Sequence, residues 1–252
     1  MMPRYVLMTG TDTGVGKTIA TAALAATLSA TGGKVIMVKP IQTGHITPDD
    51  PEREKLEAHY TDVVTESDAQ IIARLTGIET FTHLTLRLPM APVPAARAEN
   101  AVLPTAGEHA TVIDDLATRT GADHVLIEGA GGVLVDFGGH TLADLAHALS
   151  GASDHEVGSV IIARSRLGTL NHTALTAEAL RHRGIAVAGI IIGSWPDPAL
   201  PVDVDNRQAL SAIAPVLGAI PAGVGDRLST EEFRARASGW LTCLELVKSC
   251  DN

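Results

Sequence analysis

A glycine-rich stretch near the start of the chain, Gly10–Thr18 (GTDTGVGKT), restricts the possible folds more than any other feature. An apolar run, Tyr5–Met8, precedes this stretch, and an alanine-rich run, Ile19–Ala30, follows it. This order predicts a strand, a tight turn and a helix. Glycines let such a turn aim backbone N–H groups inward, and the helix N-terminus adds partial positive charge. The stretch is therefore typical of a phosphate-binding loop.

The loop also carries the side chains that nucleotide chemistry requires. Lys17 is placed to reach the outer phosphates, and the hydroxyl of Thr18 can hold Mg²⁺. The strict pattern has a glycine five residues before Gly16, where this chain has Thr11; its glycine lies one residue earlier. A glycine-rich turn beside a solvated lysine is the alternative interpretation, but the strand before the loop and the helix after it disfavour that alternative.

The composition fits one α/β domain. At 252 residues and 45% hydrophobic content the chain can bury a large core, and aliphatic residues must fill it because aromatics make up only 3%. A net charge of −10 disfavours nucleic acid and anionic membranes as partners. The positive potential of a phosphate site must then be local, and Lys17 and Lys39 are the lysines placed to provide it.

The cysteines and the hydropathy indicate a cytoplasmic protein. Only Cys243 and Cys250 are present, which fits neither a disulfide framework nor a metal-binding pattern and suits a reducing compartment. The apolar run before the glycine-rich loop is too short for a signal peptide. No apolar stretch has the length of a membrane span.

Apolar runs alternate with helical segments along the chain. The expected strands are Tyr5–Met8, Val35–Val38, Val125–Ile127, Val160–Ala163, Val187–Ile192 and Val216–Ile220. The expected helices are Thr18–Ser29, Glu66–Leu75, Thr105–Thr118, Leu142–Leu149, Leu170–Arg181 and Asp203–Ile213. Continuous apolar strands suit a parallel sheet that is covered on both faces. We therefore predict a single-domain, doubly wound α/β fold of the P-loop NTPase type, with a mostly parallel sheet and ligands at the carboxyl ends of its strands.

Three charged residues are expected beside the phosphate loop. Lys39 ends the second strand, where Pro40 stops it, although an ordinary surface lysine is the alternative. Glu128 ends the third strand and is followed by Gly129-Ala130-Gly131-Gly132, which favours a Mg²⁺ ligand over a simple turn cap. Asp68 lies near a helix start, and its interpretations as dipole compensation or as a Mg²⁺ ligand both stay open.

Several segments are expected to be loops or surface residues. His45–Thr65 is polar and contains two prolines, so we expect a loop. Pro89–Pro94 contains three prolines and is expected to form a loop over one edge of the site, neither a regular helix nor a central strand. His83 and His109 are expected at the surface.

Four segments, taken in order, resemble the ATP-dependent dethiobiotin synthetases: Gly10–Thr18, Lys39–Gly44, Glu128–Gly132 and Leu167–His172. The resemblance extends from about residue 4 to about residue 223. It implies a cyclo-ligase that forms C–N bonds from 7,8-diaminononanoate, CO₂ and ATP with Mg²⁺. One amine takes up CO₂ as a carbamate, the carbamate attacks the γ-phosphate to give a mixed carbamic–phosphoric anhydride, and the second amine closes the ring of dethiobiotin, so that ADP and phosphate are released.

The resemblance also implies roles for individual residues. Lys17 and Lys39 would be catalytic, and Thr18, Asp68 and Glu128 would hold the metal. The substrate would be bound by Thr13, Lys39, Thr43, Gly168, Thr169, Leu170 and Asn171. The last four would come from the neighbouring subunit of a homodimer and bind the substrate's distant carboxylate. The nucleotide would be bound by Gly14, Val15, Gly16, Lys17, Thr18, Ile19, Asp68, Glu128, Gly129, Ala130, Gly131, Gly193, Ser194, Pro221, Ala222 and Gly223.

One position departs from that family. Gly193 and then Ser194 stand where the family often has an asparagine that contacts adenine. The missing amide predicts that nucleoside triphosphates other than ATP also serve.

We expect residues 1–228 to form the P-loop synthetase domain, and residues 229–252 to add a C-terminal helix and tail of the same domain. Another P-loop amidoligase of cofactor synthesis is the nearest alternative. A partitioning or switch ATPase like ParA is a second, although such proteins usually have an extra lysine early in the loop, where this chain has Thr11-Asp12-Thr13.

Overall fold

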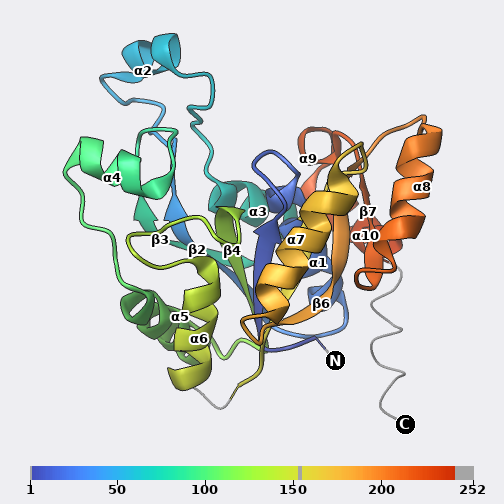
Figure 1. The fold of residues 1–252 in the computed structure, drawn as a ribbon. Helices are drawn as coiled ribbons and strands as arrows, with labels where there is room; N and C mark the ends of the chain where they lie inside the picture. Colours follow the sequence, from blue (N-terminus) through green and yellow to red (C-terminus); the bar gives the residue numbers. More distant parts are fainter. Residues whose placement is uncertain (1, 153–154, 242–252) are drawn as a thin grey trace.

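The computed structural model describes residues 2–152 and 155–241. Seven strands form one sheet in the order β3-β2-β4-β1-β5-β6-β7, and every neighbouring pair is parallel (Figure 1). The strands are β1 (Tyr5–Gly10), β2 (Val35–Gln42), β3 (Glu79–Thr85), β4 (His124–Gly132), β5 (Val157–Ala163), β6 (Ala186–Trp195) and β7 (Val216–Pro221). The predicted doubly wound α/β fold is confirmed, with a sheet that is parallel throughout.

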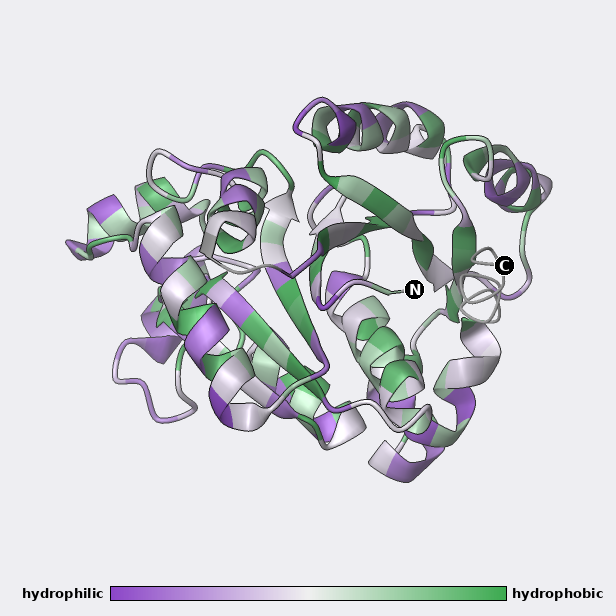
Figure 2. Cartoon of the chain, turned by 90° about the horizontal axis from the view of Figure 1, so that it is seen from below, coloured by the Kyte–Doolittle hydropathy of each residue, from purple (hydrophilic) through white to green (hydrophobic). Residues whose placement is uncertain are grey.

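Helices cover both faces of the sheet. One face carries α1 (Lys17–Ala30), α3 (Asp68–Thr76) and α10 (Thr230–Trp240), and the other carries α5 (Ala106–Thr120), α6 (Leu142–Ala152), α7 (Thr169–Arg181) and α8 (Pro201–Leu210). Three shorter helices are α2 (Arg53–His59), α4 (Pro92–Glu99) and α9 (Val224–Arg227). Figure 2 shows the largely apolar strands between helices whose polar residues face outward. The sheet is buried on both sides, as its continuous apolar strands require.

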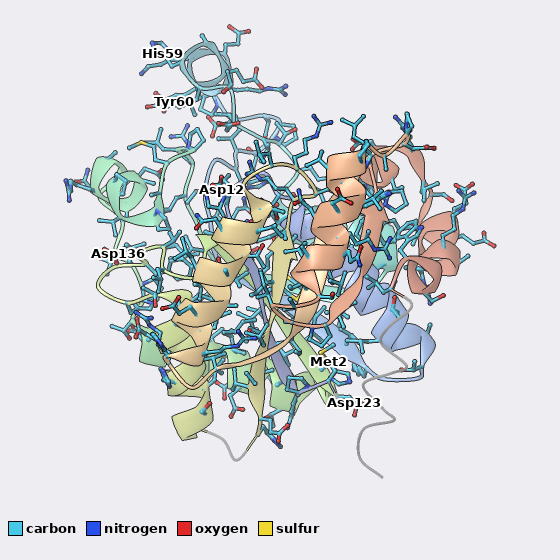
Figure 3. All side chains as sticks on the ribbon, turned by 45° about the vertical axis from the view of Figure 1, so that its right-hand side comes forward. Met2, Asp12, His59, Tyr60, Asp123 and Asp136 are labelled. Carbon is cyan, nitrogen blue, oxygen red and sulfur yellow. The ribbon has the colours of Figure 1, made fainter. Side chains whose placement is uncertain are left out.

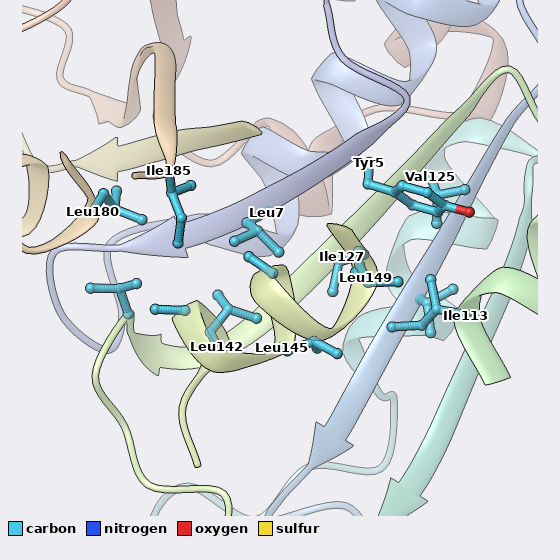
Figure 4. Packing of buried hydrophobic residues seen from close by; sticks show 14 of the residues in the cluster. Tyr5, Leu7, Ile113, Val125, Ile127, Leu142, Leu145, Leu149, Leu180 and Ile185 are labelled. Atoms are coloured by element: carbon cyan, nitrogen blue, oxygen red, sulfur yellow. The ribbon is translucent and has the colours of Figure 1, made fainter. Parts of the chain in front are cut away.

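Two apolar cores result. Leu7, Ile127 and Leu145 belong to the core between the sheet and α5 and α6 (Figure 4). On the opposite face, the alanines of α1 let this helix pack closely on the sheet, and Leu24 and Met8 belong to the same core. The close packing of α1 matters for function, because α1 begins at the phosphate loop.

The edge strand β3 escaped prediction. Its sequence, ETFTHLT, has only two apolar residues, Phe81 and Leu84, and none of its side chains is fully buried. A strand at the edge of the sheet contacts less protein than a central one, so it carries no continuous apolar run.

Lys39 does not end β2, because the strand continues through Pro40 to Gln42, and Glu128 lies within β4, which extends to Gly132.

Three further predictions were wrong. Pro89–Pro94 is a loop only as far as Ala91, because α4 begins at Pro92; the first turn of a helix needs no N–H donors and therefore accepts proline. The segment His45–Thr65 contains α2, a helix without buried residues. His109 lies in the core with no exposed surface, where its ring contacts that of His83.

The described residues contain no helix with the length and apolarity to cross a membrane. Cys243, Cys250 and the expected tail lie outside the described residues. The proposed division at residue 228 stays a prediction.

Candidate active site

The phosphate loop lies at the carboxyl end of β1, in the centre of the sheet. Gly14 and Gly16 adopt positive φ angles of 69° and 88°, which side chains disfavour. Gly16 also lies directly against β6, because a Cβ on it would be 2.4 Å from the carbonyl oxygen of Gly193. A Cβ on Gly193 would in turn be 2.1 Å from the carbonyl oxygen of Val15. Two glycines, far apart in sequence, therefore permit the loop to take this position.

Lys39 lies buried between two carboxylates at the inner end of the site. Its Nζ is 2.6 Å from Oδ2 of Asp68 and 3.0 Å from Oε1 of Glu128, and it also donates to the carbonyl of Gly129. Burial alone would lower the pKa of Lys39, but the charges of Glu128 and Asp68 outweigh it and raise the pKa above its usual value. Burial would raise the pKa of Asp68, but the ammonium of Lys39 holds it below its usual value. Lys39 is therefore an ammonium, and Asp68 a carboxylate.

The hydroxyl of Thr18 lies against the same two carboxylates. Its Oγ1 is 2.9 Å from Oδ1 of Asp68 and 3.2 Å from Oε1 of Glu128. The second carboxylate oxygen of Glu128, Oε2, is buried without a hydrogen-bond partner among the described residues. A hydroxyl, two carboxylates and an unpaired buried oxygen fit Mg²⁺, which prefers oxygen ligands and keeps some of its waters. Among the described residues, no group of three or more His, Cys, Asp or Glu side chains could hold a metal ion.

Lys17 stands beside this cluster. Its Nζ donates to the carbonyl of Asp12 at 3.3 Å, and the Asp12 side chain is held by Arg164 at 2.9 Å. Burial, followed by the positive charge of Lys39, lowers the pKa of Lys17. Two cations and two carboxylates thus meet around one point, at which the charge of a phosphate group would be compensated.

A cavity of about 680 Å³ opens from this cluster. Many of the predicted site residues line it: Thr13, Gly14, Gly16, Lys17, Thr18, Ile19, Lys39, Thr43, Asp68, Glu128, Ala130 and Gly131. Pro89–Pro92 also line it, as expected for a segment over one edge of the site. Sequence reasoning missed other lining residues, among them Ile41, Gln42, Asp62, Ile71 and Val135. Gln42 lies three residues after Lys39, at the carboxyl end of β2, and this place in the sequence could have indicated that it lines the cavity. Its side-chain oxygen accepts a hydrogen bond from the N–H of Asp68 at 3.1 Å.

Two predicted groups lie outside this cavity. Gly193 and Ser194 lie within β6, Pro221 ends β7, and Ala222 and Gly223 follow it; of these, Gly193 contacts the phosphate loop. Val15 and Gly129 also do not line the cavity. Gly168, Thr169, Leu170 and Asn171 form the start of α7, where Leu167 is 87% exposed. Within one copy of the chain, the start of α7 is not part of the cavity wall.

Comparison with known proteins assigns the chain to a family. A family model described as "AAA domain" matches residues 4–223. The ATP-dependent dethiobiotin synthetase of Mycobacterium avium is 42% identical over 247 residues, which cover 95% of this chain and 98% of that protein. The chain belongs to the ATP-dependent dethiobiotin synthetase family. The family's enzyme from Streptomyces avermitilis is 41% identical, with 94% of this chain and 91% of that protein covered.

The fold has more distant relatives as well. The cell division ATPase MinD of Pyrococcus furiosus superposes with a TM-score of 0.52 at 18% identity, covering 94% of this chain and 98% of that one. At this identity the likeness concerns the fold alone.

Proposed function

We propose that this protein is an ATP-dependent dethiobiotin synthetase, a ligase that uses a nucleoside triphosphate to close a cyclic urea from 7,8-diaminononanoate and CO₂. The observation that carries the proposal is the meeting of Lys17, Lys39, Thr18, Asp68 and Glu128 at the inner end of one cavity. The family membership supports the same activity.

The chain's own residues would act by position and charge. The N–H groups of the phosphate loop bind the triphosphate, and Lys17 and Lys39 compensate the negative charge that builds up as the γ-phosphoryl group moves to the carbamate oxygen. Thr18, Asp68 and Glu128 would hold Mg²⁺, which neutralises phosphate charge when bound. Thr13 and Thr43 lie on the wall of the same cavity and orient the diamine by hydrogen bonds. The second amine displaces phosphate from the anhydride, so no protein nucleophile is needed.

A homodimer would complete the substrate site. The substrate carries a carboxylate far from its amines, and the helix start of α7 has the polarity to bind it. Leu167, Leu170 and Leu175 around this end of α7 are exposed, which suits contact with a second copy. We place the enzyme in the cytoplasm.

The direct test is mass-spectrometric detection of dethiobiotin after incubation with diamine, bicarbonate and MgATP. We expect product from the wild type and from Lys34→Ala, whose lysine is exposed and lies far along the sheet, at the start of β2. Lys17→Ala should give none. ATP consumption that is independent of diamine and bicarbonate would contradict the proposal and indicate a switch ATPase.

A further inference from the structure

One residue of the cavity wall, Asp62, belongs to a segment that leaves the sheet directly after β2. The chain turns away at Gly44, passes through α2 and returns at Val64, where it forms a bridge with His45. In Figure 1, α2 stands out from the body on the side of the phosphate loop. Figure 3 shows His59 and Tyr60 at its tip, above Asp12. On its way back, this segment brings Asp62 to the cavity.

The position of Asp62 is fixed by backbone contacts. A Cβ on Gly44 would lie 2.8 Å from the carbonyl oxygen of Asp62, and Gly44 has a positive φ of 71°. The N–H of Val64 donates to the carbonyl of Gly44 at 2.8 Å, and the N–H of Ile46 donates to the carbonyl of Val64 at 3.0 Å. These contacts hold Asp62 beside the residue that follows Thr43.

Asp62 differs from the other carboxylates of the cavity. Asp68 and Glu128 are both engaged by Lys39 and Thr18. Across residues 2–152 and 155–241, the Asp62 side chain forms neither a hydrogen bond nor an ion pair. It is thus a free negative charge on the wall of a cavity whose inner end holds two lysines.

The substrate of the proposed reaction needs such a charge. One of its two neighbouring amines must be neutral to take up CO₂, while the other remains an ammonium in neutral solution. Lys17 and Lys39 repel an ammonium, so these two lysines disfavour binding of the diamine with its amines toward the inner end of the cavity. A carboxylate on the outer wall offsets this repulsion and pairs with the charged amine.

We propose that Asp62 is a specificity-determining residue that binds the ammonium group of the diamine and orients the neutral amine toward the lysines. This inference rests on the proposed function. Asp62 lies in an exposed segment, so the pairing is partly screened by water, and its loss should weaken substrate binding by about 3- to 10-fold.

The test compares Asp62→Asn with the wild type in steady-state assays. We expect the KM for 7,8-diaminononanoate to rise by about 3- to 10-fold, with the KM for ATP unchanged. The control is Glu54→Gln, an exposed carboxylate on α2 that does not line the cavity, which should leave both constants unchanged. Thermal denaturation shows whether either variant alters the fold.

A second measurement separates charge recognition from a structural effect. Binding of the diamine is compared with that of a nonanoate carrying one amine, in the wild type and in Asp62→Asn. We expect the preference for the diamine to shrink in the variant; equal weakening of both ligands, or no weakening, would overturn the inference. Lack of diamine turnover by the wild type would instead overturn the proposed function.

Discussion

The inner and outer parts of the cavity are built in opposite ways. At the inner end, Lys39 and Glu128 come from neighbouring strands β2 and β4 and are 3% and 0% exposed. On the outer wall, Asp62 belongs to the segment 45–65, whose helix α2 has no buried residue. Salt bridges from Asp50 and Glu52 to Arg87, which lies between β3 and α4, connect that segment to the rest of the domain. The charges of Lys39 and Glu128, to which we assign the handling of phosphate, are thus fixed by the sheet, whereas the proposed recognition of the diamine depends on an exposed segment.

This difference has an energetic counterpart. Ionic interactions in a buried cluster are strong, and removing one partner leaves an uncompensated charge. Ionic interactions at a surface are screened, and each contributes about 1 kcal/mol or less. Substitutions at the inner end should therefore affect both catalysis and folding, and those at the outer wall should affect substrate binding with little effect on stability.

The largest effect is expected for Lys39→Gln. Loss of the ammonium should lower kcat by about 10²-fold or more, because a charge-stabilising donor is removed. It should also lower the free energy of unfolding of the nucleotide-free protein by about 3 kcal/mol, because Asp68 and Glu128 lose their counter-charge. Turnover and urea denaturation measure the two effects.

The control for this variant is Lys55→Gln, whose lysine is 72% exposed and forms only a surface ion pair with Glu52. Mg²⁺ should restore part of the stability of Lys39→Gln by replacing the missing positive charge. Normal turnover in Lys39→Gln would show that this lysine has no role in the reaction, and the inner and outer parts of the cavity would then not differ in the way described.

Gly193→Ala should have the next largest effect. The new Cβ would lie 2.1 Å from the carbonyl oxygen of Val15 and 2.7 Å from Cγ2 of Ile162, so the phosphate loop must shift. Overpacking of this kind costs about 1–3 kcal/mol, which corresponds to a rise of about tenfold in the Kd for ATP. Calorimetric titration with ATP measures this Kd. The control is Gly239→Ala, at a position in α10 where a new Cβ meets no other atom. An unchanged Kd for ATP in Gly193→Ala would mean that the phosphate loop can move away from β6 without loss of ATP binding.

The choice of base should matter less than the phosphates. Because Gly193 supplies no side-chain amide, we expect kcat/KM for ATP, CTP, GTP and UTP to agree within about tenfold, less than a bidentate base contact would give. Parallel assays with the four nucleotides decide this. A strong preference for ATP over all three others would require another adenine-binding group.

The smallest effect is expected for Arg87→Ala, which frees the segment 45–65 from its anchor at Asp50 and Glu52. We expect the KM for the diamine to rise by about threefold and the KM for ATP to stay constant, because only surface pairs are lost. Arg53→Ala is the matched control, since Arg53 pairs with Glu57 inside the same segment. A change in ATP binding would show that the two regions are coupled.

The sequence allowed the fold and the inner end of the cavity to be predicted, for a common reason. Buried parallel strands require apolar runs, and the residues that follow them must meet at one edge of the sheet, which indicated Lys39 and Glu128. The alternatives for Asp68 could not be decided locally, because its distance to Lys39 depends on how α3 packs. Asp62 escaped prediction, since it lies in a polar segment without periodicity, and only the bridge between His45 and Val64 brings it to the cavity.

The contact between Gly16 of the phosphate loop and Gly193 of β6 couples two positions that lie far apart in the sequence. Exchange of Gly193 for an amide-bearing residue would give the purine a partner but would simultaneously push against the chain that cradles the triphosphate. In this structure, a larger side chain at position 193 would therefore need a compensating shift of the phosphate loop before it could read the base.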